Sequence, residues 1–202
     1  MMHVRSALLL STFALGSMSL SASFSSAFAQ GSAPCPSAPV GDHGQPVDGK
    51  ALASPAATAE TRLEGKAVMI HYNAPSVRCR TIMGGVVPFD KVWRTGANPA
   101  TTLMTATALK IGNLDVPAGT YTVYSLPEAA GTPWQLIVNK QTGQWGTVYK
   151  PEMDLGRTPM MSKPAAHPQE VMSLSFEDVH GKTATLHIRW ADTDEYVKVV
   201  AE

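Results

Sequence analysis

The sequence predicts an all-β fold, an antiparallel β-sandwich of about eight strands. Two observations predict it: short alternating or β-branched apolar runs recur from about residue 61, and turn-forming residues separate them. The chain has no convincing amphipathic helix, because its one run with helical character, residues 168–172, is too short to be independent. A partly open β-barrel is the alternative arrangement of the same strands.

The first predicted strands lie between residues 67 and 126. Residues 67–72 place Val68, Ile70 and Tyr72 on one face of a strand. Residues 101–111 form a second run, rich in Thr, Leu, Met and Ala. Residues 120–126 follow a Pro-Ala-Gly turn, in which proline fixes one φ angle and glycine permits an unusual one.

The remaining predicted strands fall into two hairpins and a closing strand. Residues 134–138 and 145–149 flank a predicted loop at 139–143, and residues 171–176 and 183–190 flank a turn at 178–182. The last strand is predicted at residues 196–200. Before it, the polar sequence Asp192-Thr193-Asp194-Glu195 predicts a solvated turn, since it lacks the glycine and the terminal glutamate of a calcium-binding EF-hand loop.

Residues 1–29 have the pattern of a secretory signal peptide. Arg5 precedes a mostly apolar run at residues 7–20, and Ala27-Phe28-Ala29 forms a cleavage pattern before Gln30. A retained membrane anchor is the weaker alternative, because six serines between residues 17 and 26 dilute the apolar run. We therefore expect a soluble periplasmic or secreted protein with no membrane span after cleavage. Its Pro/Ala/Ser-rich arm spans residues 30–60, and a single domain spans residues 61–202.

Charge and cysteine content narrow the partners and the redox chemistry. Removing residues 1–29 leaves 15 basic against 16 acidic residues, which argues against nucleic acid or an anionic membrane as a partner. Cys35 and Cys79 are the only cysteines, so export predicts a disulfide between them. A free or dimer-forming thiol is the alternative, whereas a redox-active pair is disfavoured because there is no C-x-x-C motif.

Several motifs in the middle of the chain are specific enough to suggest a family. They are residues 75–80 (PSVRCR), 84–89 (GGVVPF), 91–98 (KVWRTGAN) and 117–121 (PAGTY), followed by Asn139-Lys140 and by residues 144–146 (QWG). Together they resemble the proteins catalogued as domain of unknown function 2911. The resemblance covers roughly residues 60–200 and implies an exported, β-rich bacterial domain, with no catalytic assignment to carry over. Two departures stand out: Cys79 replaces the glycine usual in the family, and Pro99 replaces a common acidic residue.

The segment from Trp93 to Asn98 is the best candidate for a ligand-facing surface. The guanidinium of Arg94 can bind a carboxylate or phosphate in a bidentate manner, with Arg80 and Lys91 nearby in the sequence to add positive potential. This interpretation is an anion or sugar-acid pocket with Trp93 as an apolar wall and Asn98 as a polar contact. The alternative is a structural corner, with Trp93 in the core.

A second group of polar and aromatic residues could lie at the same end of the sandwich. It consists of Asn139, Lys140 and Trp145, and stacking platforms for a sugar ring could come from Trp134, Trp145 and Tyr149. Tryptophan in a β domain is more often part of the core, because each ring buries a large area.

Neither a metal, a cofactor nor a catalytic motif is predicted. His71 and His187 lie in predicted strands, but no histidine or cysteine spacing typical of a metal site accompanies them. The sequence contains no G-x-S-x-G motif and no glycine-rich phosphate-binding loop.

We therefore expect a non-catalytic module that binds a small ligand (a sugar or an anion) or a protein partner of the cell envelope. One alternative is an enzyme acting on a sugar or small ester through loop residues. The other is an envelope-assembly or interaction module that pairs through an exposed sheet edge.

Overall fold

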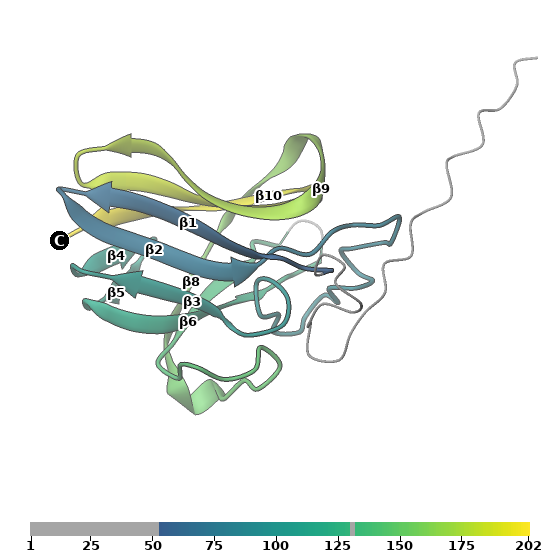
Figure 1. Cartoon of the computed structure of the whole chain (residues 1–202), viewed down its shortest axis with the longest axis horizontal. Coiled ribbons are helices and arrows are strands. Elements are labelled where there is room, and N and C mark those ends of the chain that lie inside the picture. Colours follow the sequence, from purple (N-terminus) through teal and green to yellow (C-terminus); the bar gives the residue numbers. More distant parts are fainter. Residues whose placement is uncertain (1–52, 130–131) are drawn as a thin grey trace, which may run out of the picture. The chain divides into compact units, whose positions relative to one another are not determined.

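The computed structural model describes residues 53–129 and 132–202, and ten β-strands account for most of them (Figure 1). The strands are β1 (Ala56–Leu63), β2 (Lys66–Asn73), β3 (Thr101–Thr105), β4 (Leu109–Ile111), β5 (Leu114–Val116), β6 (Gly119–Leu126), β7 (Gln135–Asn139), β8 (Asp154–Pro159), β9 (Met161–His180) and β10 (Thr183–Ala201). They form a six-stranded sheet of order β1-β2-β3-β6-β7-β8 and a four-stranded sheet of order β5-β4-β10-β9. All pairings between neighbouring strands are antiparallel. The predicted all-β sandwich is confirmed.

The six-stranded sheet owes its two faces to the alternation of side chains along each strand. In β2, Val68, Ile70 and Tyr72 are buried, whereas Met69 and His71 lie on the opposite face. β1 and β2 are joined by Glu64 and Gly65, whose φ angles of 48° and 79° suit the tight hairpin turns that match strand twist.

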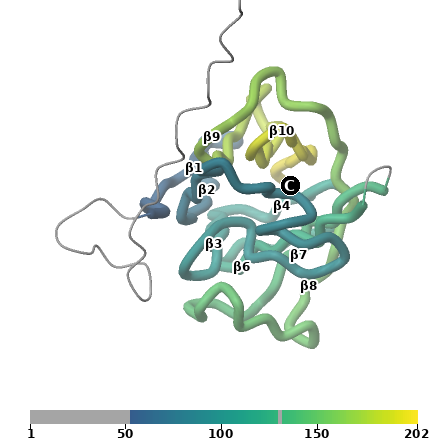
Figure 2. Tube along the Cα trace, turned by 90° about the vertical axis from the view of Figure 1, so that its right-hand side faces the viewer, coloured from purple at the N-terminus to yellow at the C-terminus, as the bar shows by residue number. Residues whose placement is uncertain are grey.

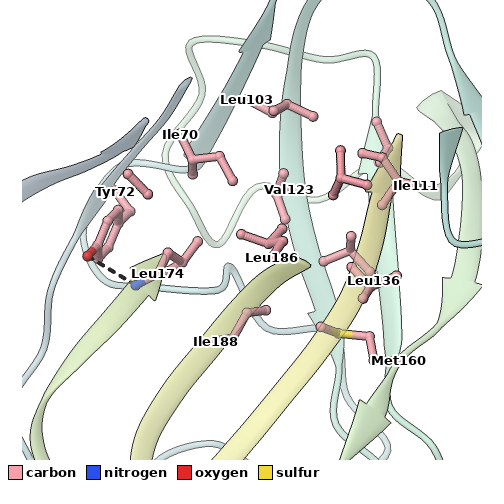
Figure 3. Packing of buried hydrophobic residues seen from close by; sticks show 14 of the residues in the cluster. Ile70, Tyr72, Leu103, Ile111, Val123, Leu136, Met160, Leu174, Leu186 and Ile188 are labelled. Atoms are coloured by element: carbon pink, nitrogen blue, oxygen red, sulfur yellow. Dashed lines mark hydrogen bonds between the residues drawn. The ribbon is translucent and has the colours of Figure 1, made fainter. Parts of the chain in front are cut away.

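The core lies between the two sheets (Figure 3). Leu103, Val123 and Leu136 from the six-stranded sheet face Leu186 and other apolar side chains of β9 and β10. Burying each such side chain stabilises the fold by about 1.5–3 kcal/mol. One hydrogen bond also joins the sheets, because the Leu174 amide donates to the Tyr72 hydroxyl across 3.1 Å.

The two sheets remain separate and do not close into a barrel, although their edge strands lie next to each other. β1 lies beside β9, where the Glu64 amide donates to the Gly181 carbonyl across 3.0 Å. β5 lies beside β8, where the Asn113 amide donates to Thr158 Oγ1 across 3.1 Å. Figure 2 shows the β9–β10 hairpin and β4 stacked over the six-stranded sheet.

Several predicted boundaries differ from the structure. The run at residues 101–111 divides into β3 and β4. Residues 168–172, judged too short for an independent helix, belong to β9. Residues 145–149 form a loop over β6 instead of a strand, and the true partner of β7 is β8. β1 begins at Ala56, inside the range expected for the arm. The sequence did not reveal this strand, because only Ala59 and Leu63 are buried and its apolar pattern is therefore weak.

The signal peptide, most of the arm and Cys35 lie outside the described residues, so those predictions stay predictions. Among the residues described, no helix has the length and hydropathy needed to cross a membrane.

Candidate functional site

The β9–β10 hairpin bends sharply near Ala191. Register shifts flank this residue in the pairing with β9, and its φ angle of 52° lies in the left-handed region. Seven residues of straight strand would span about 23 Å. Yet His187 Nδ1 lies 2.7 Å from Asp194 Oδ1, so the bend brings the two halves of β10 together.

Four side chains form a charged network inside this bend, which we call the bend cluster: Glu177, His187, Arg189 and Asp194. Arg189 Nε donates to Asp194 Oδ2 across 2.9 Å, and both terminal nitrogens of Arg189 donate to the Glu177 carboxylate. The side chains of His187 and Asp194 are only 4% and 3% exposed. Bidentate, charge-assisted bonds of this kind hold two strands in a fixed geometry.

The bend cluster keeps its carboxylates ionised. Hydrogen bonding by the Arg189 guanidinium lowers the pKa of Glu177 to about 2. Burial raises the pKa of Asp194, but the hydrogen bonds from His187 and Arg189 outweigh it, and the net pKa is lowered. His187 Nδ1 lies between Asp194 Oδ1 at 2.7 Å and Arg189 Nη2 at 3.0 Å, and its Nε2 faces Glu177 Oε2 at 3.7 Å.

The expected solvated turn at residues 192–195 is wrong. These residues continue β10, and Asp194 and Glu195 are 2% and 1% exposed. Their polarity indicated a turn, but the bend folds them inward, where Arg189 and Ser162 supply partners for the two carboxylates. The flanking Trp190 and Tyr196 were the sequence signal that the strand continues through this segment.

Glu195 is an unusual buried acid. Ser162 Oγ donates to Glu195 Oε1 across 2.6 Å, while Oε2 is buried without a hydrogen-bond partner. Burial, helped by the negative charge of Asp194, raises the pKa of Glu195 to about 7 against the lowering effect of Ser162. A carboxyl group poised near neutrality and behind a serine is a feature typical of functional sites.

A surface cavity of about 460 Å³ opens in front of this serine. Its walls include Glu128, Thr132, Trp134, Met160, Ser162 and Tyr196. The volume lies within the range of small-molecule sites, about 300–1,000 Å³, and combines aromatic walls with a few polar groups. The cavity and the buried Glu195 together form the candidate site. Trp134 was expected as a platform, but Ser162, Tyr196 and Glu195 were not predicted, because the long-range pairing of β9 with β10 brings them together.

The predicted segment from Trp93 to Asn98 forms a corner that is tied to the sheet. The Trp93 ring stacks on Trp190 at 5.9 Å between centroids and meets Trp134 edge-on at 6.4 Å. The Thr95 and Ser125 hydroxyls are hydrogen-bonded at 2.7 Å, and both are fully buried. Trp93 therefore packs against the core.

The structure brings one member of the second predicted group, Trp145, to the corner formed by Arg94 and Asn98. Pro99 and Trp145 form an isolated β-bridge, and the Gly146 amide donates to the Asn98 carbonyl across 3.2 Å. A Cβ at Gly146 would lie 2.2 Å from Arg94 Cδ, so this glycine permits the close approach. Arg94 is half-buried with its Nε unpaired, and burial lowers its pKa.

The other predicted residues are dispersed. Arg80 folds back on its own loop and donates to the Ser76 and Val77 carbonyls, while Lys91 and Lys140 are exposed. Asn139 is fully buried, and its amide nitrogen donates to the Lys150 carbonyl and to Asp154 Oδ1, both at 2.9 Å. None of the eight predicted ligand-binding residues is among those that line the 460 Å³ cavity. Their binding role stays a prediction.

A comparison with known families identifies the family of this chain. The model described as "Protein of unknown function (DUF2911)" matches residues 54–199. The chain belongs to this family. No curated protein and no solved structure matches it.

The loop before β3 of this DUF2911 member has an unusual backbone at Cys79. Cys79 has a φ angle of 55°, and Arg78 before it has 47°. This left-handed conformation favours glycine, so a cysteine here is held against its local preference. The Arg78 amide donates to Glu170 Oε1 across 2.9 Å, which anchors the loop to β9.

Proposed function

We propose that this DUF2911 protein is an exported, non-catalytic module that binds a small, neutral, hydroxyl-rich ligand such as a sugar. The supporting observation is the cavity in front of Ser162, where aromatic rings lie beside polar groups. Trp134 and Met161 offer apolar surface, and Glu128 and Ser162 offer hydrogen-bond acceptors for hydroxyl groups, whereas the Tyr196 ring is stacked on His187 at 5.3 Å and lies under the Lys163 ammonium.

Charge in the cavity distinguishes between the two ligand classes expected from the sequence. Its lining contains a glutamate and neither lysine nor arginine. An anion would meet like charge there, whereas a polyol would find acceptors for its hydroxyl hydrogens. The arginines that suggested an anion site lie elsewhere, in the Arg78–Arg80 loop and at the Arg94 corner.

The cavity is tested by substituting Glu128 with glutamine and titrating glucose, galactose and N-acetylglucosamine by calorimetry. We expect at least one sugar to bind the wild type and Glu128→Gln to weaken it about tenfold, which corresponds to one lost hydrogen bond to a charged group. Glu152→Gln is the matched control, because Glu152 is exposed in the short 3-10 turn η2 (Pro151–Met153) and is not part of the cavity wall.

Two results would contradict this proposal. Equal sugar binding by Glu128→Gln and Glu152→Gln would show that the sugar does not bind in the cavity. Hydrolysis of a nitrophenyl ester or glycoside by the wild type, lost in Ser162→Ala, would favour an enzyme instead, with Glu195 as the base that activates Ser162.

The assembly alternative has less support. β9 is an edge strand of its sheet, but it carries Lys163, Pro164 and Pro168 and pairs with β10 through register shifts. Lysine, proline and bulges are the devices that prevent strands from pairing edge to edge.

Export and the disulfide are proposed with this function, and both are tested by intact-mass analysis of the protein from the periplasm. We expect a mature chain that begins at Gln30 and weighs two hydrogen atoms less than its dithiol form, because Cys35 and Cys79 are paired. Retention of residues 1–29, or two titratable thiols in the native protein, would contradict these proposals.

A further inference from the structure

The outward face of β2 and β3 carries two methionines among polar residues. Met69 and Met104 are directly paired across the two strands, and the neighbouring pair on the same face is His71 with Thr102. On β1, Glu60 and Thr58 are the partners of Met69 and His71. The outer face of an antiparallel sheet is ordinarily polar, so a facing pair of thioethers needs an explanation.

Burial shows that the methionines do not belong to the core. Val68, Ile70 and Leu103, which alternate with them, are 0%, 0% and 2% exposed and lie between the sheets. Met69 and Met104 are half-buried and line the same hollow of about 270 Å³ on the outer face. The two methionine side chains therefore border one shared space.

His71 is two residues from Met69 on the same face, a separation of about 7 Å along a strand, and directly paired strand residues lie about 4.5–5.5 Å apart. Its side chain borders a neighbouring hollow, which Thr58 and Thr102 also line. Its Nδ1 is hydrogen-bonded to Thr58 Oγ1 at 2.8 Å. With Nδ1–H donating to the threonine, Nε2 carries the free lone pair, which is the usual arrangement of a metal-binding histidine.

We propose that Met69, Met104 and His71 bind a monovalent copper ion. Two thioethers are soft donors, which select Cu(I), and imidazole also binds copper, whereas zinc sites in proteins use thiolate, imidazole and carboxylate ligands. The part of the chain that the structure describes holds no group of three or more His, Cys, Asp or Glu residues able to bind a metal. Histidine and cysteine spacing does not reveal the proposed set, because two of its ligands are methionines on different strands.

The test uses the mature protein labelled with carbon-13 at its methionine methyl groups. We expect one equivalent of Ag(I), a redox-stable substitute for Cu(I), to shift the Met69 and Met104 signals and to leave those of Met153, Met160, Met161 and Met172 in place. This readout is specific to the site, so ion binding by cysteine thiols would not imitate it.

Affinity is measured anaerobically by competition for Cu(I) with bicinchoninate. We expect Met69→Leu, Met104→Leu and His71→Gln each to weaken binding at least about tenfold, and Thr58→Val to weaken it by about 10–100-fold through the loss of the second-shell hydrogen bond. Met161→Leu is the control, since Met161 is 52% exposed on β9 and outside the site. Leucine keeps the volume of methionine, so these variants should fold.

Unchanged methyl signals would overturn the proposal. So would Cu(I) binding that survives both methionine substitutions, or a loss as large in Met161→Leu as at the proposed ligands. Sugar binding at the cavity does not depend on these residues, so either proposal can fail alone.

Discussion

Replacing Arg189 with alanine is expected to lower the free energy of unfolding by about 3–4 kcal/mol. The change removes the donor that holds both Glu177 and Asp194, and the Asp194 side chain is only 3% exposed. Breaking a buried ion pair by deleting one partner typically costs about 3–5 kcal/mol, because a charge is left without compensation. In Arg189→Ala the His187 side chain still contacts Asp194, so the expected loss of unfolding free energy lies toward the lower end of this range. Urea denaturation followed by circular dichroism measures it.

Two further variants test whether the bidentate geometry and the burial of the Arg189 ion pairs account for this loss of stability. Arg189→Lys keeps the positive charge but loses the bidentate bond to Glu177, so it should be destabilised less than Arg189→Ala. Lys110→Ala breaks an exposed pair, Lys110 Nζ to Asp115 at 2.7 Å, and should leave the urea midpoint almost unchanged. Equal midpoints for Arg189→Ala and Lys110→Ala would mean that the bend cluster does not hold the hairpin.

Local sequence was sufficient to predict much of the fold. Val68, Ile70 and Tyr72 fixed the core face of β2, and the turn predicted at residues 178–182 contains the shorter turn, residues 181–182, that joins β9 to β10. The sequence did not reveal that β9 and β10 are 20 and 19 residues long. Prolines in β9 and the acidic run in β10 resemble strand breaks, yet bulges carry the pairing past them.

The candidate site was harder to predict than the fold. Ser162 and Glu195 are 33 positions apart and meet only because β9 and β10 are paired in that register. By contrast, the approach of Trp145 to the Asn98 corner agrees with the expectation that the two lie at the same end of the sandwich, although residues 145–149 were predicted as a strand and form a loop. Long-range strand register therefore determines which side chains share the candidate site.

Replacing Glu195 with glutamine is expected to remove a pH dependence of stability worth about 3 kcal/mol. Burial raises the pKa of Glu195 to about 7, against an ordinary value of 4.5. Each pKa unit corresponds to about 1.4 kcal/mol of linkage, so ionising this group in the folded state costs about 3 kcal/mol. Glutamine keeps the shape and cannot ionise. Unfolding free energies of both proteins between about pH 2 and pH 8 give the comparison, with Glu152→Gln as the control.

The sign of the effect distinguishes Glu195 from the bend cluster. A raised pKa means that the stability contributed by Glu195 is fully present below about pH 4.5 and is lost as the pH rises through about 7. Glu177 acts in the opposite sense, because its pKa is lowered to about 2, so its contribution is present above pH 4.5 and is lost as the pH falls toward 2. The wild type should therefore be most stable near pH 4.5–5, where Glu195 is protonated and Glu177 is still ionised. In Glu195→Gln the decline on the alkaline side should disappear while the decline on the acid side remains. A slope between pH 5 and pH 7 that persists in this variant would show that another group is responsible and that Glu195 is not the poised acid behind the cavity.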